Sequence, residues 1–363
     1  MTHAPQIHTM SLVTVCVPAH NAGQTLARTL DSLIAQDYPN LEIIVSDSES
    51  TDNTPQVAQA YAEHGVHYVR NPECVRNPGT DNWNYVLSYA LSLGRSLIAL
   101  YHADDLYAPT MVSRQVAFLD VHPEVDAVFT MSQKIDEEDR PNRMGITRLP
   151  DELRGQECFD FPTLFNAILK HTDFISTPTL MTRRETLEAV GNFDPQFVSA
   201  IDLDLWLRMA RYRPIGIIDE PLHLYRISAR QGSAQMEKSR TYEAHWFMVM
   251  DRYLAIPEVR PLARPDALAF YEMQRSIDRV RRAMILLREG QTEEGRSLLE
   301  TAHPWRYLLL ARCRPYRLGQ LMLGTALWLS ARLGLARLGG HVAQKMYQIE
   351  INRRQRPMKK ASG

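Results

Sequence analysis

Two groups of carboxylates in this chain could share one reaction. Asp104 and Asp105 follow a short apolar run, and Asp202 stands roughly 100 residues later in a segment with the apolar spacing of a helix. Divalent cations such as Mg²⁺ and Mn²⁺ prefer oxygen ligands, and a carboxylate held away from the cation can act as a base. This combination suits metal-assisted chemistry on a diphosphate leaving group.

Alternating strand and helix patterns would bring these residues to one edge of a sheet. Strands are predicted at 12–17, 41–45, 66–69, 97–101 and 125–131, with helices following residues 21, 53, 79 and 108. Such alternation is typical of a mostly parallel sheet with right-handed crossovers, in which ligands bind beyond the carboxyl ends of the strands. Pro18, Asp47 and Asp104 each follow a predicted strand, so we expect them on a common rim.

The second half of the chain has a less regular pattern. We expect a loop at 136–154, a helix at 161–169, a strand at 174–181, a helix at 200–212, and edge strands at 215–218 and 222–227. From residue 241 onward the apolar spacing predicts helices throughout. Residues 267–287 and 292–301 are predicted to form a helical hairpin.

Charge is unevenly distributed along the 363 residues, although the formal net charge is only -1. From Thr301 onward there are 12 lysines and arginines and one acidic residue. This excess favours an anionic partner such as a membrane surface, although a solvated basic helix and tail would give the same pattern. The four cysteines stand far apart, so their spacing predicts neither a metal-binding pair nor a disulfide framework.

An ordered series of short motifs resembles the bacterial family 2 glycosyltransferases, whose fold is known as GT-A. The resemblance covers residues 12 to about 233 and rests on Val17-Pro18-Ala19-His20-Asn21, residues 46–54, His102-Ala103-Asp104-Asp105, residues 202–208 and Tyr225-Arg226. It implies an α/β fold with a Rossmann-like, mostly parallel central sheet, here followed by a C-terminal all-helical region. It also implies an inverting enzyme that moves a sugar from a nucleotide-diphosphate sugar to an acceptor hydroxyl in cell-surface polysaccharide biosynthesis.

The resemblance gives the first two motifs a role in binding the nucleotide. Pro18, Ala19 and Asn21 would line the base pocket, and Asp47 would accept a hydrogen bond from the base, typically a uracil edge. A UDP-sugar is therefore the favoured donor. An Asp that forms the turn after a strand is the alternative for Asp47. Asp52 is expected to cap the following helix in preference to contacting ligand.

The third motif matches the metal-binding Asp-x-Asp-Asp pattern of the family, with His102 in place of the first Asp. The resemblance implies that Asp105 binds Mn²⁺ or Mg²⁺ and that Asp104 contacts the donor ribose or supports the metal ligands. The two charges could instead favour the start of the next helix. For His102 a structural role is preferred to metal ligation.

The fourth motif places the catalytic base of the family at Asp202. An acceptor hydroxyl attacking the anomeric carbon needs a base on its own side and positive charge at the departing diphosphate. Many relatives have Glu before this Asp, whereas Ile201 stands there in this chain. Asp204 is expected to be structural, and Trp206 to belong to the core in preference to an acceptor platform.

The chain departs from the family after Tyr225-Arg226, because Ser228 stands where many relatives have a His that contacts the metal or the diphosphate. Two alternatives follow: weak metal binding, or contact of Arg230 and Gln231 with the diphosphate in place of the His. Asn77 also matches a family position near the donor. For Asn82 and Asn84, helix capping and ligand contact remain equal alternatives.

The expected organisation is a flexible N-terminus at 1–10, a catalytic domain at 11–235, a helical region at 236–352 and a basic tail at 353–363. Within the catalytic domain, 11–135 would bind the nucleotide sugar and 136–235 the acceptor. The polar N-terminus lacks an apolar signal segment, so a cytoplasmic location is expected. The apolar, Arg-flanked stretch at 318–335 is predicted to lie on the cytoplasmic face of a membrane or, alternatively, to pack on the catalytic domain or a second copy.

Other functions fit the motifs less well. A sugar-nucleotide nucleotidyltransferase would need a Gly-rich loop with a basic residue after the first strand, and residues 18–21 contain neither Gly nor Lys. A nucleic-acid partner is not expected, because the predicted rim lacks basic residues. A glycan or a lipid-linked oligosaccharide is the expected acceptor. The main alternative is a catalytically silent member of the fold that binds nucleotide sugar or serves as a scaffold.

Overall fold

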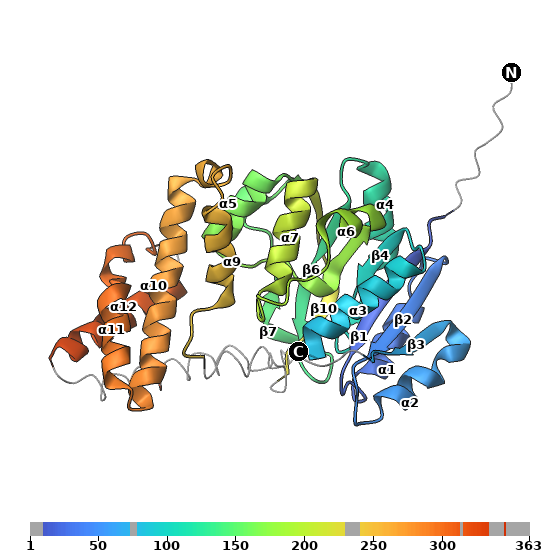
Figure 1. Cartoon of the computed structure of the whole chain (residues 1–363), viewed down its shortest axis with the longest axis horizontal. Coiled ribbons are helices and arrows are strands. Elements are labelled where there is room, and N and C mark those ends of the chain that lie inside the picture. The colour runs from blue at the N-terminus through green and yellow to red at the C-terminus, as the bar shows by residue number, and fades with distance from the viewer. Residues whose placement is uncertain (1–9, 73–77, 229–239, 313–314, 334–344, 346–363) are drawn as a thin grey trace, which may run out of the picture.

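The computed structural model of the protein describes residues 10–72, 78–228, 240–312, 315–333 and 345. A sheet flanked by helices forms one part of the molecule, and a group of long helices lies beside it (Figure 1). The strands lie between Val13 and Arg226, and the long helices follow from His245 onward. The predicted α/β fold with a C-terminal helical region is therefore confirmed for the part of the chain that the structure describes.

The described strands form a single sheet in the order β3-β2-β1-β4-β9-β6-β10-β5, with β7 beside β6 and β8 beside β10. Strands β3, β2, β1 and β4 are parallel, as are β6 and β10, whereas β9 is antiparallel to both its neighbours. The strands are β1 (Val13–Ala19), β2 (Leu41–Asp47), β3 (Val66–Arg70), β4 (Leu97–Leu100), β5 (Leu106–Tyr107), β6 (Ala127–Ile135), β7 (Pro141–Ile146), β8 (Cys158–Phe159), β9 (Leu180–Arg183) and β10 (Ile215–Arg226).

Two hydrophobic cores cover the two faces of the sheet, because successive side chains of a strand point to opposite faces. In β1, Val15 and Val17 pack in the core that includes residues of α1, α2 and α4, whereas Cys16 packs in the core that includes α3, α5, α6 and α7. The helices are α1 (Leu26–Ile34), α2 (Thr54–Ala60), α3 (Pro78–Ser92), α4 (Met111–Val121), α5 (Phe161–His171), α6 (Arg184–Val190) and α7 (Ile201–Tyr212).

Several predictions for the middle of the chain were wrong. The two expected edge strands at 215–218 and 222–227 are one strand, β10, which lies between β6 and β5 and has a register shift between Ile218 and His223. The expected loop at 136–154 contains β7. The strand expected at 174–181 starts only at Leu180, as β9, because Thr177–Thr179 forms a 3₁₀ turn. These segments are polar or interrupted by Pro, so their local sequence does not predict strands. Whether a strand forms there depends on pairing with other strands of the sheet.

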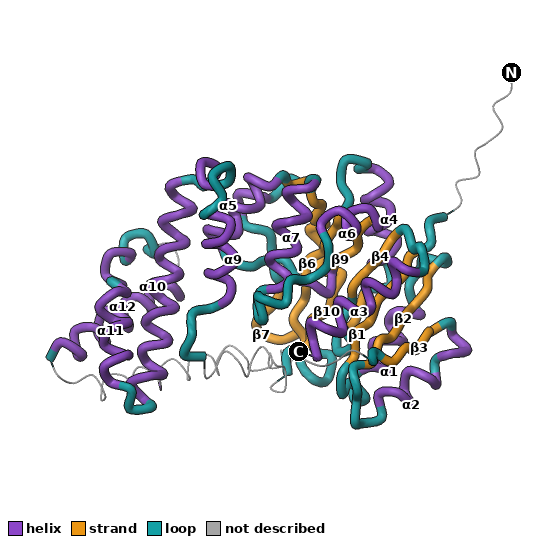
Figure 2. Tube along the Cα trace, viewed as in Figure 1, coloured by secondary structure: helices purple, strands orange, loops and turns teal. Residues whose placement is uncertain are grey.

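The helical region follows the predicted pattern. It comprises α9 (His245–Leu254), α10 (Pro265–Arg288), α11 (Thr292–Ala302) and α12 (Pro315–Arg332), and α10 with α11 forms the predicted hairpin (Figure 2). Amide side chains join α10 and its preceding loop to α5. Gln274 Nε2 donates to the Leu169 carbonyl at 2.9 Å, and Asn166 Nδ2 donates to the Leu262 carbonyl at 2.8 Å. The remaining short 3₁₀ turns are Ala62–His64, Asp151–Leu153, Arg260–Leu262 and Pro304–Tyr307.

Helix α12 divides its apolar side chains between packing and exposure. Leu321 and Leu327 are buried in clusters with residues of α10 and, for Leu327, α11, rather than against the sheet. Met322 and Leu329 on α12 and Leu333 after it are 59%, 50% and 76% exposed. Within the described residues, no helix has the length and apolar character needed to cross a membrane.

Candidate active site

A cleft of about 1390 Å³ opens at the carboxyl edge of the sheet. Its wall includes residues that follow β1 and β4, residues of β6 and β10, and the first turn of α7. Of the predicted site residues, Pro18, Asn21, Asp104 and Asp202 line this cleft. The fold therefore brings together residues that lie far apart in the sequence.

Asn21 holds the loop after β1 in place. It has a φ of 49°, a left-handed conformation that Asn adopts more readily than most residues. Its Oδ1 accepts a hydrogen bond from the Thr51 backbone N–H at 2.9 Å, and its own N–H donates to Ser50 Oγ at 2.8 Å. These bonds join the loops that follow β1 and β2. The helix expected directly after residue 21 is α1, which starts only at Leu26.

Asp47, the last residue of β2, lies next to these hydrogen-bonded loops and is only 2% exposed. Its Oδ2 accepts a hydrogen bond from the Tyr68 hydroxyl at 2.9 Å, and its Oδ1 accepts one from Ser50 Oγ at 2.5 Å. Burial and this carboxylate raise the pKa of Tyr68 to about 12. Asp47 is thus buried and bonded by two side chains, and its role in base recognition stays a prediction.

Other polar residues near this end of the cleft support the backbone. Asn82 Nδ2 donates to the carbonyls of Ala19, at 3.1 Å, and Ser46, at 2.8 Å, and thereby ties the ends of β1 and β2 together. Asn84 bonds the backbone of Phe193 through both amide atoms. Asp52 stands one residue before the N-cap Asn53 and supports the start of α2, since its Oδ1 accepts from the Thr54 N–H at 2.9 Å. It also lines the cleft, so its contact with ligand stays open.

Asp105 is fully buried between β4 and β10. Its Oδ2 bonds His223 Nε2 at 2.9 Å, and its Oδ1 accepts from the Arg226 backbone N–H at 2.8 Å. Burial alone would raise its pKa, but His223, His102 and the Arg226 N–H together hold the pKa below its usual value. Both oxygens of Asp105 therefore serve to attach β10 to the loop after β4.

Asp104 and His102 line the cleft in front of Asp105. Burial lowers the pKa of His102 to about 4, so its imidazole is neutral at neutral pH. Its Nε2 is buried and has no hydrogen-bond partner among the described residues, and its ring contacts Trp83 with the centroids 4.9 Å apart. One ligand atom each from His102, Asp104 and Asp105 lies within 4.8 Å of the others. This group could hold a divalent cation.

Arg226 fixes the loop that carries these residues. Its guanidinium Nε donates to the Asp104 carbonyl at 2.7 Å, and its Nη1 donates to the Glu137 carbonyl at 3.2 Å. The side chain is 2% exposed and also pairs with Asp139. The Arg of the Tyr225-Arg226 motif therefore positions the cation-binding group from behind.

Asp202 stands in the first turn of α7, at a different part of the cleft wall. Its Oδ1 accepts from the Leu203 N–H at 2.9 Å, and its Oδ2 accepts from Thr177 Oγ1 at 3.0 Å. Burial raises its pKa, although both hydrogen bonds act in the opposite direction. A carboxylate can accept about four hydrogen bonds, so each oxygen of Asp202 keeps capacity for another donor.

Two charged residues that sequence reasoning missed complete this side of the cleft. Asp173 lies close enough to Asp202 for the two carboxylates to interact, and burial together with Asp202 raises its pKa well above the usual value. Lys134 acts against this rise and stacks its ammonium 3.9 Å from the centre of the Tyr225 ring. Neither residue belongs to a motif, so only their positions at the ends of β6 and α5 reveal them.

The remaining site predictions have mixed outcomes. Asn77 and Arg230 lie outside the described residues. Ser228 lines the cleft, and its hydroxyl donates to Glu137 at 2.8 Å. Asp204 is structural as predicted, since it pairs with Arg208 at 2.8 Å. Trp206 is fully buried in the core, which confirms the preferred interpretation.

Comparison with known proteins agrees with the geometry. Residues 14–191 match the family model described as glycosyl transferase family 2. The chain is 25% identical over 233 residues to the UDP-Glc:alpha-D-GlcNAc-diphosphoundecaprenol beta-1,3-glucosyltransferase of Escherichia coli, which covers 63% of this chain and 82% of that protein. It is also 25% identical over 241 residues to an uncharacterized glycosyltransferase of Rickettsia typhi, with coverages of 65% and 70%.

Solved structures share the fold at low sequence identity. Residues 1–349 of S. aureus TarS in complex with UDP-GlcNAc match with a TM-score of 0.58 at 16% identity, covering 93% of this chain and 92% of the other. The mannosyltransferase PcManGT from Pyrobaculum calidifontis, in complex with GDP-Man and Mn²⁺, matches with a TM-score of 0.53 at 20% identity, with coverages of 95% and 89%. Motif order, sheet topology and the family match together identify residues 14–191 as a family 2 glycosyltransferase domain with the GT-A fold.

Proposed function

We propose that the protein transfers a sugar, with inversion at the anomeric carbon, from a nucleotide-diphosphate sugar to a hydroxyl of a glycan or lipid-linked acceptor in surface polysaccharide synthesis. The observation that carries this proposal is the position of Asp202 and Asp104 on different parts of one cleft. A UDP-sugar is the favoured donor, supported by the UDP-Glc-dependent E. coli relative and the UDP-GlcNAc complex of TarS.

The residues around His102 fit a divalent cation. The orphaned, buried Nε2 of a neutral imidazole and the Asp104 carboxylate are nitrogen and oxygen donors of the kind that Mn²⁺ accepts. The sequence assigned the metal to Asp105, but Asp105 is fully buried and each of its oxygens bonds a group of β10. We therefore assign His102 and Asp104 to the cation and Asp105 to holding them. The cation would supply positive charge to the departing diphosphate.

Asp202 is the proposed base on the acceptor side. In its ionised form it accepts the proton of the attacking hydroxyl as the bond to the anomeric carbon forms. Thr177 fixes the orientation of the carboxylate, and the N-terminal turn of α7 favours its negative charge. Asp173 is the neighbouring carboxylate. Burial and Asp202 oppose its ionisation, whereas the Lys134 ammonium favours it.

Loss of the Thr177 hydroxyl should shift the pH dependence of the reaction. Because the hydroxyl stabilises ionised Asp202, Thr177→Val should raise the pKa of the base. As the pH is lowered, the variant should therefore lose activity at a higher pH than the wild type. A hydrogen bond worth about 1 kcal/mol corresponds to roughly 0.7 pH unit. The measurement is the acid limb of kcat/KM against pH. Thr177→Ser keeps the hydroxyl and should show the acid limb of the wild type. If Thr177→Val also showed the wild-type limb, the Thr177 hydroxyl would not interact with the titrating base.

The donor proposal can be tested without knowledge of the acceptor. A ligand that binds only the native state raises the unfolding temperature, so thermal shifts can be measured for a panel of nucleotide sugars with and without Mn²⁺. We expect the largest shift with a UDP-sugar, and only when Mn²⁺ is present. If no nucleotide sugar stabilised the protein in either condition, the cleft would not be a donor site.

Contact with a membrane surface is proposed for the exposed side of the C-terminal helix. The full chain should co-sediment with anionic vesicles, and less so at high salt, because basic residues contribute roughly 1 kcal/mol each near such a surface. Replacing Met322, Leu329 and Leu333 together by Ser should reduce this binding several-fold without disturbing the buried side of α12. Leu93→Ser, at an exposed site in the turn after α3, is the control. Equal sedimentation of all three proteins would assign this surface to contact with another protein, such as a second copy.

A further inference from the structure

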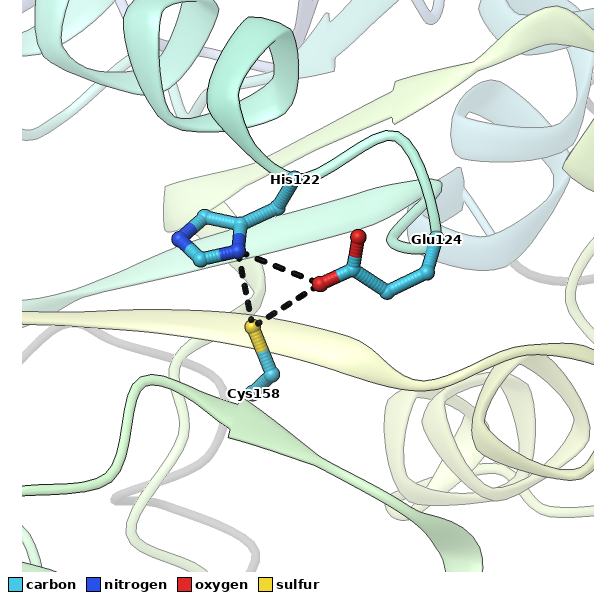
Figure 3. A group of neighbouring side chains, drawn as sticks. All are labelled: His122, Glu124 and Cys158. Atoms are coloured by element: carbon cyan, nitrogen blue, oxygen red, sulfur yellow. Dashed lines mark hydrogen bonds and ion pairs between the residues drawn. The ribbon is translucent and has the colours of Figure 1, made fainter.

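A second group of potential metal ligands lies outside the cleft, on the far end of the sheet. His122 ends α4, Glu124 lies in the turn that follows, and Cys158 belongs to β8 (Figure 3). None of the three residues lines the active-site cleft. Their spacing in the sequence gives no recognisable motif, because two short segments 34 to 36 residues apart contribute the three side chains.

We propose that His122, Glu124 and Cys158 form a binding site for Zn²⁺. All three side chains point toward one another in Figure 3. His122 Nδ1 lies 3.1 Å from Glu124 Oε1 and 3.5 Å from Cys158 Sγ, and the thiol lies 3.8 Å from the same carboxylate oxygen. In a tetrahedral zinc site, bonds of about 2.0–2.3 Å place neighbouring ligand atoms about 3.3–3.6 Å apart. Small side-chain adjustments would therefore suffice for coordination.

The chemistry of the three donors favours zinc over the cation proposed for the cleft. Thiolate sulfur and imidazole nitrogen are ligands that Zn²⁺ accepts readily, whereas Mg²⁺ and Mn²⁺ favour sites rich in oxygen. Binding would replace the thiol proton of Cys158, which leaves to solvent, by a sulfur–metal bond. Three protein ligands leave the fourth tetrahedral position to water.

Neighbouring residues hold the imidazole and the turn in position. Glu157 Oε2 lies 3.7 Å from His122 Nε2, the ring nitrogen that faces away from the cluster, which is the arrangement by which carboxylates orient metal-binding histidines. Phe118 packs on the imidazole with ring centroids 4.5 Å apart. Arg213 donates to the Pro123 and Glu124 carbonyls at 2.9 and 3.1 Å. The histidine ring and the turn that carries the glutamate are thus both fixed.

A cation here would attach β8 to the end of α4. Strand β8 consists of two residues at the end of the segment that follows β6, and Glu137, Glu138 and Thr147 of that segment line the active-site cleft. The zinc site would therefore anchor one end of a segment that forms part of the cleft wall. Its expected role is structural rather than catalytic.

Cobalt provides a direct test, because a thiolate bound to Co²⁺ gives a charge-transfer absorption band in the near ultraviolet. The full-length protein with Cys74→Ser and Cys313→Ser retains Cys158 and the fully buried Cys16. Titration with Co²⁺ should produce the band with one metal ion per chain, and Zn²⁺ should abolish it by displacing cobalt. Zn²⁺ should also slow the reaction of Cys158 with a thiol reagent at least tenfold.

Variants separate this site from the cleft. Cys158→Ser should eliminate the band, and Glu157→Gln should retain it while weakening metal affinity about 10-fold. Asp104→Ala, which removes a ligand proposed for the cleft, should leave the band unchanged. The proposal would be overturned if stoichiometric Co²⁺ produced no thiolate band, if the band survived Cys158→Ser, or if it disappeared in Asp104→Ala. Each variant changes a side chain that is at least partly exposed, so the fold should be retained.

Discussion

Replacing Asp202 by Asn should lower turnover by about 10²- to 10⁴-fold and leave donor affinity nearly unchanged. The amide keeps the shape of the side chain and can still accept the Thr177 hydrogen bond, but it cannot take a proton from the acceptor hydroxyl. Because Asp202 lies away from the proposed cation ligands, donor binding does not depend on it. Single-turnover rates and titration with nucleoside diphosphate measure the two quantities separately.

Asp204 provides the matched control. It lies two residues after Asp202 on the same helix and is buried in an ion pair with Arg208. Asp204→Asn should reduce thermal stability, with turnover per folded molecule close to that of the wild type. If Asp202→Asn retained near-normal turnover, Asp202 would have no place in the mechanism. Asp173 would then be the next candidate for the base, because it is the other carboxylate of this pair.

The two adjacent aspartates after β4 should give opposite results when each is replaced by Ala. Asp104→Ala should abolish metal-dependent binding of nucleoside diphosphate with little change in stability, because this side chain faces the cleft. Asp105→Ala should destabilise the protein by about 3–5 kcal/mol, because it leaves His223 and the Arg226 N–H buried without their partner. Calorimetric titration with UDP in the presence of Mn²⁺ and thermal unfolding distinguish the two effects.

The opposite pair of results would support the assignment made from the sequence, in which Asp105 binds the metal. If Asp105→Ala unfolded at the wild-type temperature but no longer bound Mn²⁺, and Asp104→Ala still bound the metal, then Asp105 would be the ligand. His102→Ala is an additional variant on the cleft wall. We expect it to weaken the metal dependence, because its buried Nε2 is proposed to contact the cation.

The fold was largely predictable where local patterns and tertiary structure agree. Strands β1 to β4 and the helices between them have continuous apolar runs or helical spacing, so their order and the common rim followed from the sequence. The prediction failed for β10, whose polar middle at 219–221 suggested two strands. It failed for β7, whose polar sequence forms a strand by pairing with the preceding strand β6. It failed for most of the segment at 174–181, where a 3₁₀ turn precedes β9.

The candidate site was predictable where a short motif carries it and not where packing decides. Asp104 and Asp202 were found from motifs, but only the structure shows that Arg226 holds Asp105 from behind and that Asp104 faces the cleft. Asp173 and Lys134 come from separate elements and have no motif. The cluster around Cys158 was missed for the same reason, since cysteine spacing gives no information about a histidine at the end of a distant helix.

The measurement that tests the central claim most directly is the release of nucleoside diphosphate from nucleotide sugars by the wild type and by Asp202→Asn. It can be followed with UDP-, GDP- and dTDP-sugars in the presence of Mn²⁺, with water or added glycans as acceptors. We predict Mn²⁺-dependent release from a UDP-sugar by the wild type and a loss of at least 100-fold in Asp202→Asn. Tight donor binding with equally negligible release by both proteins would contradict the account and indicate a catalytically silent nucleotide-sugar-binding protein.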